Sequence, residues 1–131
     1  MNLFFSKYKF IFYFANIFLI ILYIFPGSLL GCFIFNNCKI QPQITPNFII
    51  SSNHFYAFIM LCIIGIFTYM KSNKFNILVI YLFCLSIFLE IVHFLIPDRS
   101  FEFKDIFGNI LGVSLPIMIY IFYVKFKNFQ N

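Results

Sequence analysis

Four long apolar stretches constrain this chain more than any other feature of its sequence. They cover approximately residues 10–30, 48–70, 75–96 and 106–124. About 20 residues of α-helix cross a bilayer, so each stretch is long enough for one span. The chain is 63% hydrophobic, whereas soluble domains usually contain about 45–50% apolar residues. The sequence therefore predicts an all-α polytopic membrane protein, with four transmembrane helices in a compact bundle that forms a single domain over residues 1–131.

The distribution of apolar residues favours helices over strands. Apolar side chains surround each predicted helix axis, as expected where lipid and neighbouring helices are both apolar. The chain lacks the series of alternating segments, each about ten residues long, that is typical of a membrane barrel. Its net charge of +5 comes from basic residues near the ends of the apolar stretches. This placement predicts the lipid bilayer as a partner and no nucleic acid.

Basic residues also set the expected orientation, because Lys and Arg are enriched in cytoplasmic loops. The two connections on the other side of the membrane would hold only three basic residues, Lys39, Arg99 and Lys104. The remaining six flank the first helix, the turn between the second and third helices, and the end of the fourth: Lys7, Lys9, Lys71, Lys74, Lys125 and Lys127. This bias predicts that both termini are cytoplasmic and that residues 98–105 face outward.

Residues 31–47 are predicted to be an irregular outer loop, because Asn, Gln and Pro residues gather there. Cys32 and Cys38 lie in this loop, and the sequence leaves open whether they form a disulfide or stay free thiols. The segment ending at Cys32 also resembles a bacterial lipoprotein signal. Its apolar run is long for a signal peptide, so we expect a permanent helix.

The other two cysteines, Cys62 and Cys84, are predicted to be small packing residues inside helices. No cysteine pair has the spacing of a zinc site, and the ligands of such a site would be more clustered along the chain. From spacing alone we therefore expect no metal and no cofactor.

All four carboxylates of the chain fall within one window of 16 residues: Glu90, Asp98, Glu102 and Asp105. The same window contains His93, one of two histidines, and it lies in an otherwise apolar chain. Ionisable groups are costly within a membrane, so their concentration in one place indicates a functional region. Glu102, together with Lys104, is predicted to lie on a solvated face.

Helical spacing groups several of these residues. Glu90 and His93 are three residues apart and share a helix face. Asp105 and Asn109 share a face of the next helix. Gly108 and Gly112 form a GxxxG pair there, and we expect them to allow close packing of another helix.

A charged Glu90 within a helix needs a partner, a bound proton or a water-filled cavity. Arg99 is the expected partner, through a bidentate bridge to Glu90 or Asp105. His54 lies at the outer end of the second helix and can reach the same pocket. Two interpretations stay open: Glu90 and Arg99 lock the helices together, or Glu90 acts on a substrate or proton.

The sequence Glu90-Ile-Val-His93, followed by Pro97, Arg99, Asp105, Asn109 and Gly112 at fixed intervals, resembles the signature of the VanZ-like family of small bacterial membrane proteins. His54-Phe55 is similar to a His-Phe pair in an earlier helix of that family. The chain departs from the pattern at Ile50-Ser51, where the family has Asp-Lys, and at His93, where it commonly has Gln. The resemblance implies a bacterial cell membrane, a role in the cell envelope, and teicoplanin-type glycopeptide resistance.

Three functional classes fit these observations. The favoured one is an outward-facing pocket that binds an amphiphilic envelope ligand, such as a lipid-linked precursor or a lipoglycopeptide. The second is a membrane enzyme in which Glu90 and His93 perform acid–base chemistry on a lipid. The third is a small proton-coupled carrier, which would need to form a homo-oligomer. The candidate pocket residues are the same for all three: His54, Glu90, His93, Arg99, Asp105 and Asn109.

Overall fold

The computed structural model describes residues 2–47 and 49–130, with side chains from residue 8 onward. All its regular elements are helices: α1 (Asn2–Ile24), α2 (Leu29–Phe35), α3 (Ser52–Tyr69), α4 (Phe75–Val92), the short 3₁₀-helix η1 (His93–Leu95) and α5 (Phe103–Gln130). Within the described residues there is no strand. The predicted all-α class is therefore confirmed.

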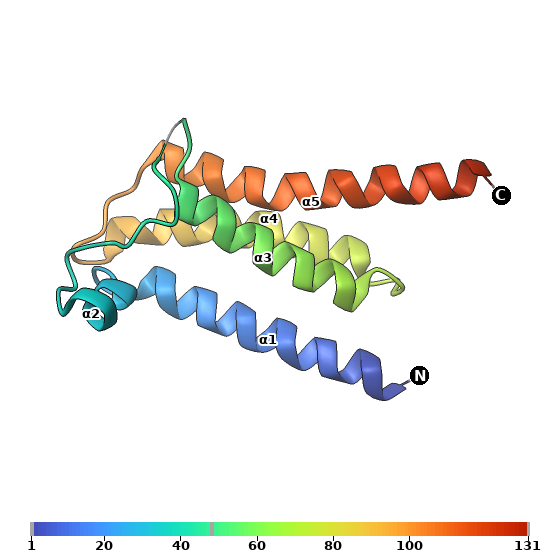
Figure 1. Cartoon of the computed structure of the whole chain (residues 1–131), viewed down its shortest axis with the longest axis horizontal. Helices are drawn as coiled ribbons and strands as arrows, with labels where there is room; N and C mark the ends of the chain where they lie inside the picture. Colours follow the sequence, from blue (N-terminus) through green and yellow to red (C-terminus); the bar gives the residue numbers. More distant parts are fainter. Residues whose placement is uncertain (1, 48, 131) are drawn as a thin grey trace.

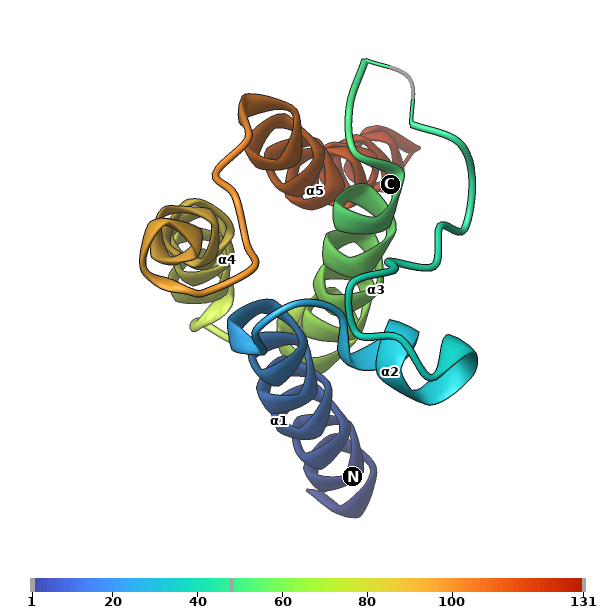
Figure 2. The same cartoon turned by 90° about the vertical axis from the view of Figure 1, so that its left-hand side faces the viewer.

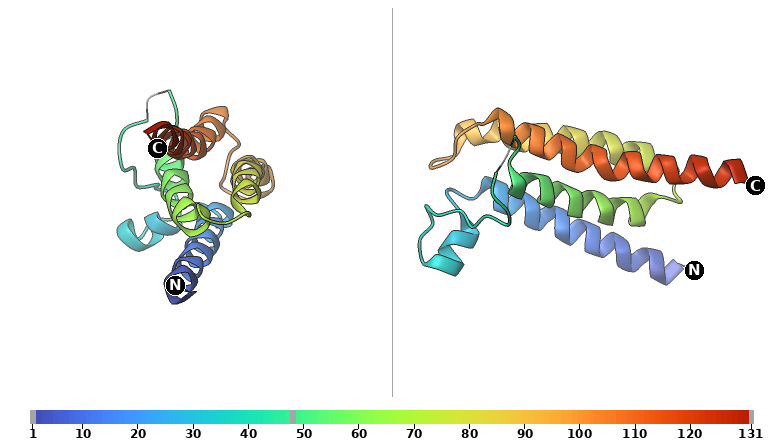
Figure 3. Two further views of the ribbon diagram at one scale, coloured as in Figure 1. Left: turned by 90° about the vertical axis from the view of Figure 1, so that its right-hand side faces the viewer. Right: turned by 45° about the horizontal axis from the view of Figure 1, so that its top comes forward.

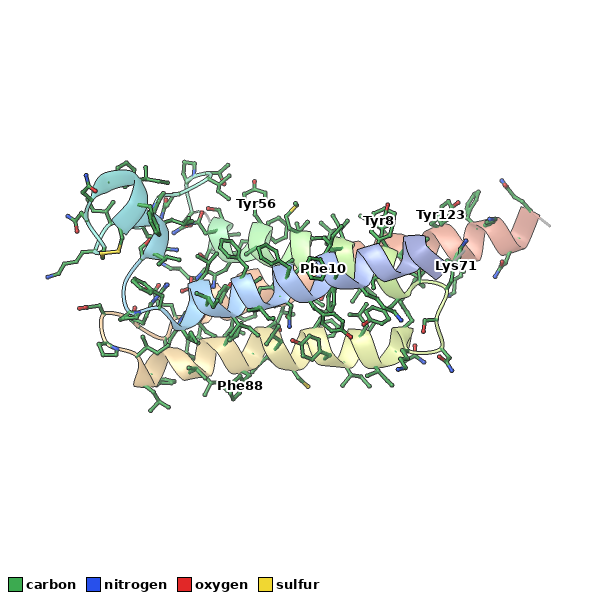
Figure 4. The ribbon with its side chains drawn as sticks, turned by 90° about the horizontal axis from the view of Figure 1, so that it is seen from below. Tyr8, Phe10, Tyr56, Lys71, Phe88 and Tyr123 are labelled. Atoms are coloured by element: carbon green, nitrogen blue, oxygen red, sulfur yellow. A yellow bond between two sulfur atoms is a disulfide. The ribbon has the colours of Figure 1, made fainter. Side chains whose placement is uncertain are left out.

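Three helices in the described part of the chain are long and apolar enough to cross a membrane: Ser52–Tyr69, Phe75–Leu95 and Phe103–Gln130. Residues Tyr8–Ile24 and Leu29–Phe35 form a fourth candidate only if this pair, bent by 84°, is counted as one span. Large apolar side chains cover the outside of the bundle, and Phe88, which is 61% exposed, points away from it (Figure 4). An apolar surface this extensive is typical of a protein that faces lipid.

The first helix was predicted over residues 10–30, and its predicted end is wrong because α1 ends at Ile24. Pro26 disfavours the helical conformation of the residue before it, and Gly27 has a φ of +77°, which glycine adopts readily. Ser28 then caps α2 by accepting a hydrogen bond of 3.0 Å from the Gly31 N–H. As a result, α2 occupies the beginning of the loop predicted over residues 31–47.

The remaining helix boundaries differ from the predictions at some ends. Phe48, the predicted start of the second helix, lies outside the described residues, and α3 itself begins at Ser52. Helix α4 continued by η1 matches the predicted 75–96. Helix α5 extends past the apolar stretch 106–124 at both ends, because the polar residues on either side also adopt helical geometry.

The four long helices lie side by side (Figures 1 and 2). Helix α3 makes its most extensive contacts with α5, and Gly112 lies where these two backbones approach closely. A Cβ atom at Gly112 would be 2.6 Å from the Phe55 carbonyl oxygen, and one at Gly108 would be 2.8 Å from the Ser51 carbonyl oxygen. The glycine pair therefore allows α3 and α5 to pack backbone against backbone.

The two ends of the bundle differ. Both chain termini and the turn between α3 and α4 lie at one end (Figure 1), and Lys71, Tyr8 and Tyr123 are found toward that end (Figure 4). Helix α2 and the connection between α4 and α5 lie at the opposite end. The C-terminal part of α5 extends past the other helices (Figure 3). Placing the termini and the Lys71–Lys74 turn on one side agrees with the expected topology, although which side is cytoplasmic stays a prediction.

The cysteines take two different roles in the structure. Cys32 and Cys38 form a disulfide that links the middle of α2 to the following segment. Cys62 is fully buried, as expected for a packing residue. Cys84 lies within α4 as predicted, but it is exposed and does not have the packing role expected of it.

Candidate functional site

A buried polar cluster forms at the end of the bundle opposite the termini. His54 lies in the first turn of α3, Glu90 near the end of α4, His93 in η1, and Asp105 and Asn109 in the first two turns of α5. The start of α3, the end of α4 and the start of α5 meet at this end because consecutive helices run antiparallel (Figure 1). Glu90 and Asn109 are 0% exposed, His93 is 2% exposed and His54 is 7% exposed.

Asn109 holds the centre of this cluster. Its Nδ2 donates a hydrogen bond of 2.9 Å to the Ser86 carbonyl oxygen, which fixes Oδ1 as the atom facing the other way. Oδ1 accepts a hydrogen bond of 2.7 Å from the Tyr23 hydroxyl and lies 3.2 Å from His54 Nδ1. Because Oδ1 can only accept, Nδ1 is the protonated nitrogen of His54 in this contact.

Glu90 and His93 are in close contact. His93 Nε2 lies 3.1 Å from the Tyr23 carbonyl oxygen, which can only accept, so Nε2 carries a hydrogen. His93 Nδ1 lies 3.2 Å from Glu90 Oε1. The imidazole is therefore held between the backbone of α1 and the buried carboxyl group.

The other side of Glu90 faces His54. Glu90 Oε1 also accepts a hydrogen bond of 3.2 Å from the Glu102 backbone N–H. Glu90 Oε2 lies 3.7 Å from His54 Nδ1, and it has no hydrogen-bond partner among the described residues. His54 Nε2 in turn lies 3.7 Å from Asp105 Oδ2. Thus His54 stands between two carboxylates contributed by different helices.

The expected ion pair between Arg99 and Glu90 or Asp105 is not formed within 4.0 Å. Arg99 instead donates to the carbonyl oxygens of Leu22, at 2.9 Å, and Phe25, at 3.3 Å. These carbonyls belong to the end of α1, where backbone acceptors lack helical partners and a cation is favourable. Partial burial lowers the pKa of Arg99, and this effect outweighs opposing coulombic interactions, including that with Glu90. Arg99 therefore caps α1 instead of neutralising the buried carboxylate.

Sequence analysis missed Tyr23. Its hydroxyl binds Asn109, and its ring lies 4.9 Å from the His54 ring and stacks at 5.7 Å on the His93 ring, centroid to centroid. Tyr23 lies in a long apolar run and is one of eight tyrosines, so it has no distinguishing local signal. Only the packing of α1 against α3 and α4 brings it to the cluster.

Glu102 and Lys104 form an ion pair of 2.8 Å, and both side chains are more than 40% exposed. This agrees with the expected solvated face. The hydrogen bond from Lys104 is the largest cause of a lowered pKa for Glu102.

Two cavities adjoin the buried cluster. One, of about 260 Å³, is polar and is lined by His54, His93 and Asp105 together with side chains of the loops. The other, of about 420 Å³, is mainly apolar and lies between α1, α2 and α3, with Leu22, Ala57 and Met60 among its walls. The larger, apolar cavity of about 420 Å³ lies within the usual range for small-molecule sites, about 300–1,000 Å³.

The structure thus gathers His54, Glu90, His93, Asp105 and Asn109 in one place, and it assigns Arg99 to the rim of both cavities. Comparisons of the chain with protein-family models, with curated proteins and with solved structures find no match. The resemblance to the VanZ-like family, carried by residues 52–114, accordingly stays a prediction.

Proposed function

We propose that this protein binds an amphiphilic ligand at the end of the bundle opposite the termini. The ligand's polar head would occupy the polar cavity, and its apolar chain would lie in the groove between α1, α2 and α3. One observation carries this proposal: the two cavities are adjacent, since they share the lining residues Gln41, Gln43, Asn53, His54 and Arg99. A polar cavity beside an apolar groove matches a molecule with both characters.

The expected orientation adds an envelope role to this proposal. The distribution of basic residues favours an outward-facing site, and disulfides such as Cys32–Cys38 persist in oxidising compartments outside the cytoplasm. The ligand would then be a lipid-linked precursor or a lipoglycopeptide in the outer leaflet of a bacterial cell membrane. The resemblance to the VanZ-like family supports the same class of ligand.

The binding test uses a polyprenyl phosphate as the probe, with native mass spectrometry of the detergent-purified protein as the measurement. Ala57 lines the apolar groove and is only partly buried, so Ala57→Phe fills the groove without removing a polar contact. We expect this variant to lose most of the bound probe. Ile80→Phe is the matched control, because Ile80 is 64% exposed on α4, outside both cavities. Equal binding by the two variants would contradict the groove.

The envelope role has its own test in cells. A susceptible Gram-positive host expressing the wild type should survive teicoplanin better than a host expressing Ala57→Phe at the same membrane level. Equal sensitivity of the two hosts would exclude the resistance role while leaving ligand binding to the mass-spectrometric result.

The close contact between Glu90 and His93 supports a second candidate, an acid–base enzyme acting on a lipid. This candidate predicts that Glu90→Gln abolishes turnover of a bound amphiphile while its binding persists. A binding protein would leave the probe chemically unchanged in the wild type as well, and the mass of the released probe distinguishes these outcomes.

A further inference from the structure

Glu90 Oε2 is the starting point, because it is a buried carboxylate oxygen with no hydrogen-bond partner among the described residues. Leaving a buried acceptor unsatisfied costs about 1–3 kcal/mol, and more for a charged group, so such an atom calls for an explanation. His54 Nδ1 lies 3.7 Å from this oxygen, which is too long for a hydrogen bond.

Two further residues place possible metal-ligand atoms close to Glu90. His54, Glu90 and Asp105 each offer one ligand atom, and these atoms all lie within 4.8 Å of one another. The three residues come from α3, α4 and α5, so the packing of the bundle itself assembles them. A tetrahedral cation with ligand bonds of about 2.0–2.2 Å keeps its ligands about 3.3–3.6 Å apart. The separation of 3.7 Å between His54 Nε2 and Asp105 Oδ2 is close to that spacing.

The surroundings prepare His54 to act as a ligand. Since Nδ1 donates to Asn109, the neutral imidazole presents its lone pair at Nε2, on the side of Asp105. A metal-binding histidine typically donates its other ring N–H to a fixed acceptor, which orients the ring. Asn109 is such an acceptor, because Ser86 and Tyr23 hold its amide in one orientation. Glu90 is oriented likewise, through the contacts of its Oε1 with Glu102 N–H and His93.

We infer that His54, Glu90 and Asp105 bind a divalent transition-metal cation. Glu90 would contribute Oε2, the oxygen that lacks a partner. One imidazole with two carboxylates suits Zn²⁺ and its neighbours better than Mg²⁺ or Ca²⁺, which prefer oxygen ligands alone. Both His54 and Asp105 line the polar cavity, which provides an entry path and a fourth, open coordination position. The site lies in the pocket of the proposed function, yet it does not require an amphiphile.

The primary experiment is calorimetric titration of Zn²⁺ into detergent-purified protein that has been stripped with a chelator. We expect one saturable site per chain. The chain contains only two histidines, so protein labelled with ¹⁵N-histidine gives two imidazole signal sets. Zn²⁺ should strongly shift the Nε2 resonance of His54 and leave His93 much less affected. A dominant shift at His93, or no saturable binding, would overturn the proposal.

Three conservative variants identify the ligands: His54→Gln, Glu90→Gln and Asp105→Asn. Each should weaken Zn²⁺ binding by at least about 10–100-fold, the loss seen even when an outer-shell partner is removed. Asn73→Asp is the control, since it makes an amide–carboxylate exchange at an exposed position in the turn at the opposite end of the bundle, and it should bind as the wild type does. Circular dichroism and gel filtration establish that every variant is folded. Unchanged affinity in the folded ligand variants would contradict the site.

Free thiols are the alternative source of Zn²⁺ binding. Replacing Cys62 and Cys84 with serine should leave the affinity unchanged, and loss of binding in that variant would overturn the proposal. Titrations with Zn²⁺ contain no polyprenyl phosphate, and the polyprenyl phosphate assay is run with and without chelator. The metal site and the amphiphile site can therefore fail independently.

Discussion

At the scale of single side chains, Asn109 connects α5 to the other three long helices. Its amide contacts Tyr23 of α1, His54 of α3 and the backbone of Ser86 in α4. Hydrogen bonds between membrane helices contribute about 0.6 kcal/mol each on average. The larger effect is the cost of leaving their partners unpaired, since every one of them is buried.

Replacing Asn109 with leucine keeps the branched shape of the side chain and removes all three contacts. We expect the free energy of unfolding to fall by about 1–3 kcal/mol for each group left without a partner. Thermal unfolding in detergent, followed by circular dichroism, measures this loss. Asn128→Leu is the control, because Asn128 is exposed near the end of α5. Equal melting of both variants would show that the network contributes nothing.

Glu102 is exposed, and it leads to a prediction about how stability depends on pH. Its pKa is lowered by Lys104, so its contribution to stability is present above the unfolded-state pKa and is lost as the pH falls through the folded-state pKa. Exposed ion pairs contribute little, so Glu102→Gln should lower the melting temperature slightly at neutral pH and not at all in strong acid. A large loss, or one that grows in acid, would contradict this assignment.

At the scale of helices, the accuracy of the predicted helix ends depended on two short-range signals, Pro97 and the Pro26–Gly27 pair. Pro97 and the following polar residues ended the third predicted helix correctly, because proline cannot continue a helical ladder. Pro26 and Gly27 carried the same information, but the apolar residues around them concealed the break after Ile24. Arg99 was expected to neutralise a carboxylate, whereas it caps α1, since the carbonyls of α1 come near it only in the folded bundle.

The packing of α5 on α3 leads to a prediction about Gly112. A methyl group there would lie 2.6 Å from the Phe55 carbonyl oxygen and 2.9 Å from Phe58 Cβ, so Gly112→Ala must push the two backbones apart. Overpacking of this kind costs about 1–3 kcal/mol. Chemical denaturation in mixed micelles measures the change. Leu111→Ala, on the half-exposed neighbouring face of α5, should have a much smaller effect, and a reversed order would argue against close packing.

At the scale of the whole molecule, the sequence predicts the helical class and the concentration of polar residues at one end. It predicts them because hydropathy and charge are local properties of the chain. The contacts between His54 and Glu90, and between Tyr23 and Asn109, span 36 and 86 residues, respectively. No local pattern encodes such distances. For the same reason linear spacing predicts no metal site, whereas the fold brings three ligand atoms together.

The orientation of the molecule leads to a labelling prediction. In a variant with Cys62 and Cys84 replaced by serine, Gln43→Cys should react with a membrane-impermeant maleimide in intact cells. Asn73→Cys, in the turn at the opposite end of the bundle, should react only after the membrane is opened. Both positions are exposed, so access alone decides the outcome. The reverse pattern would place the site on the cytoplasmic side and exclude an outer-leaflet ligand.

The central claim, that an amphiphile lies in the groove beside the buried cluster, is tested most directly by photo-crosslinking. A polyprenyl phosphate with a photoreactive group on its chain would be irradiated with the protein in nanodiscs, and the modified peptides identified by mass spectrometry. We predict crosslinks concentrated at residues 22–34 and 53–60, and their loss in Ala57→Phe. Crosslinks spread evenly over the lipid-facing sides of α4 and α5, and unchanged by that substitution, would contradict the account.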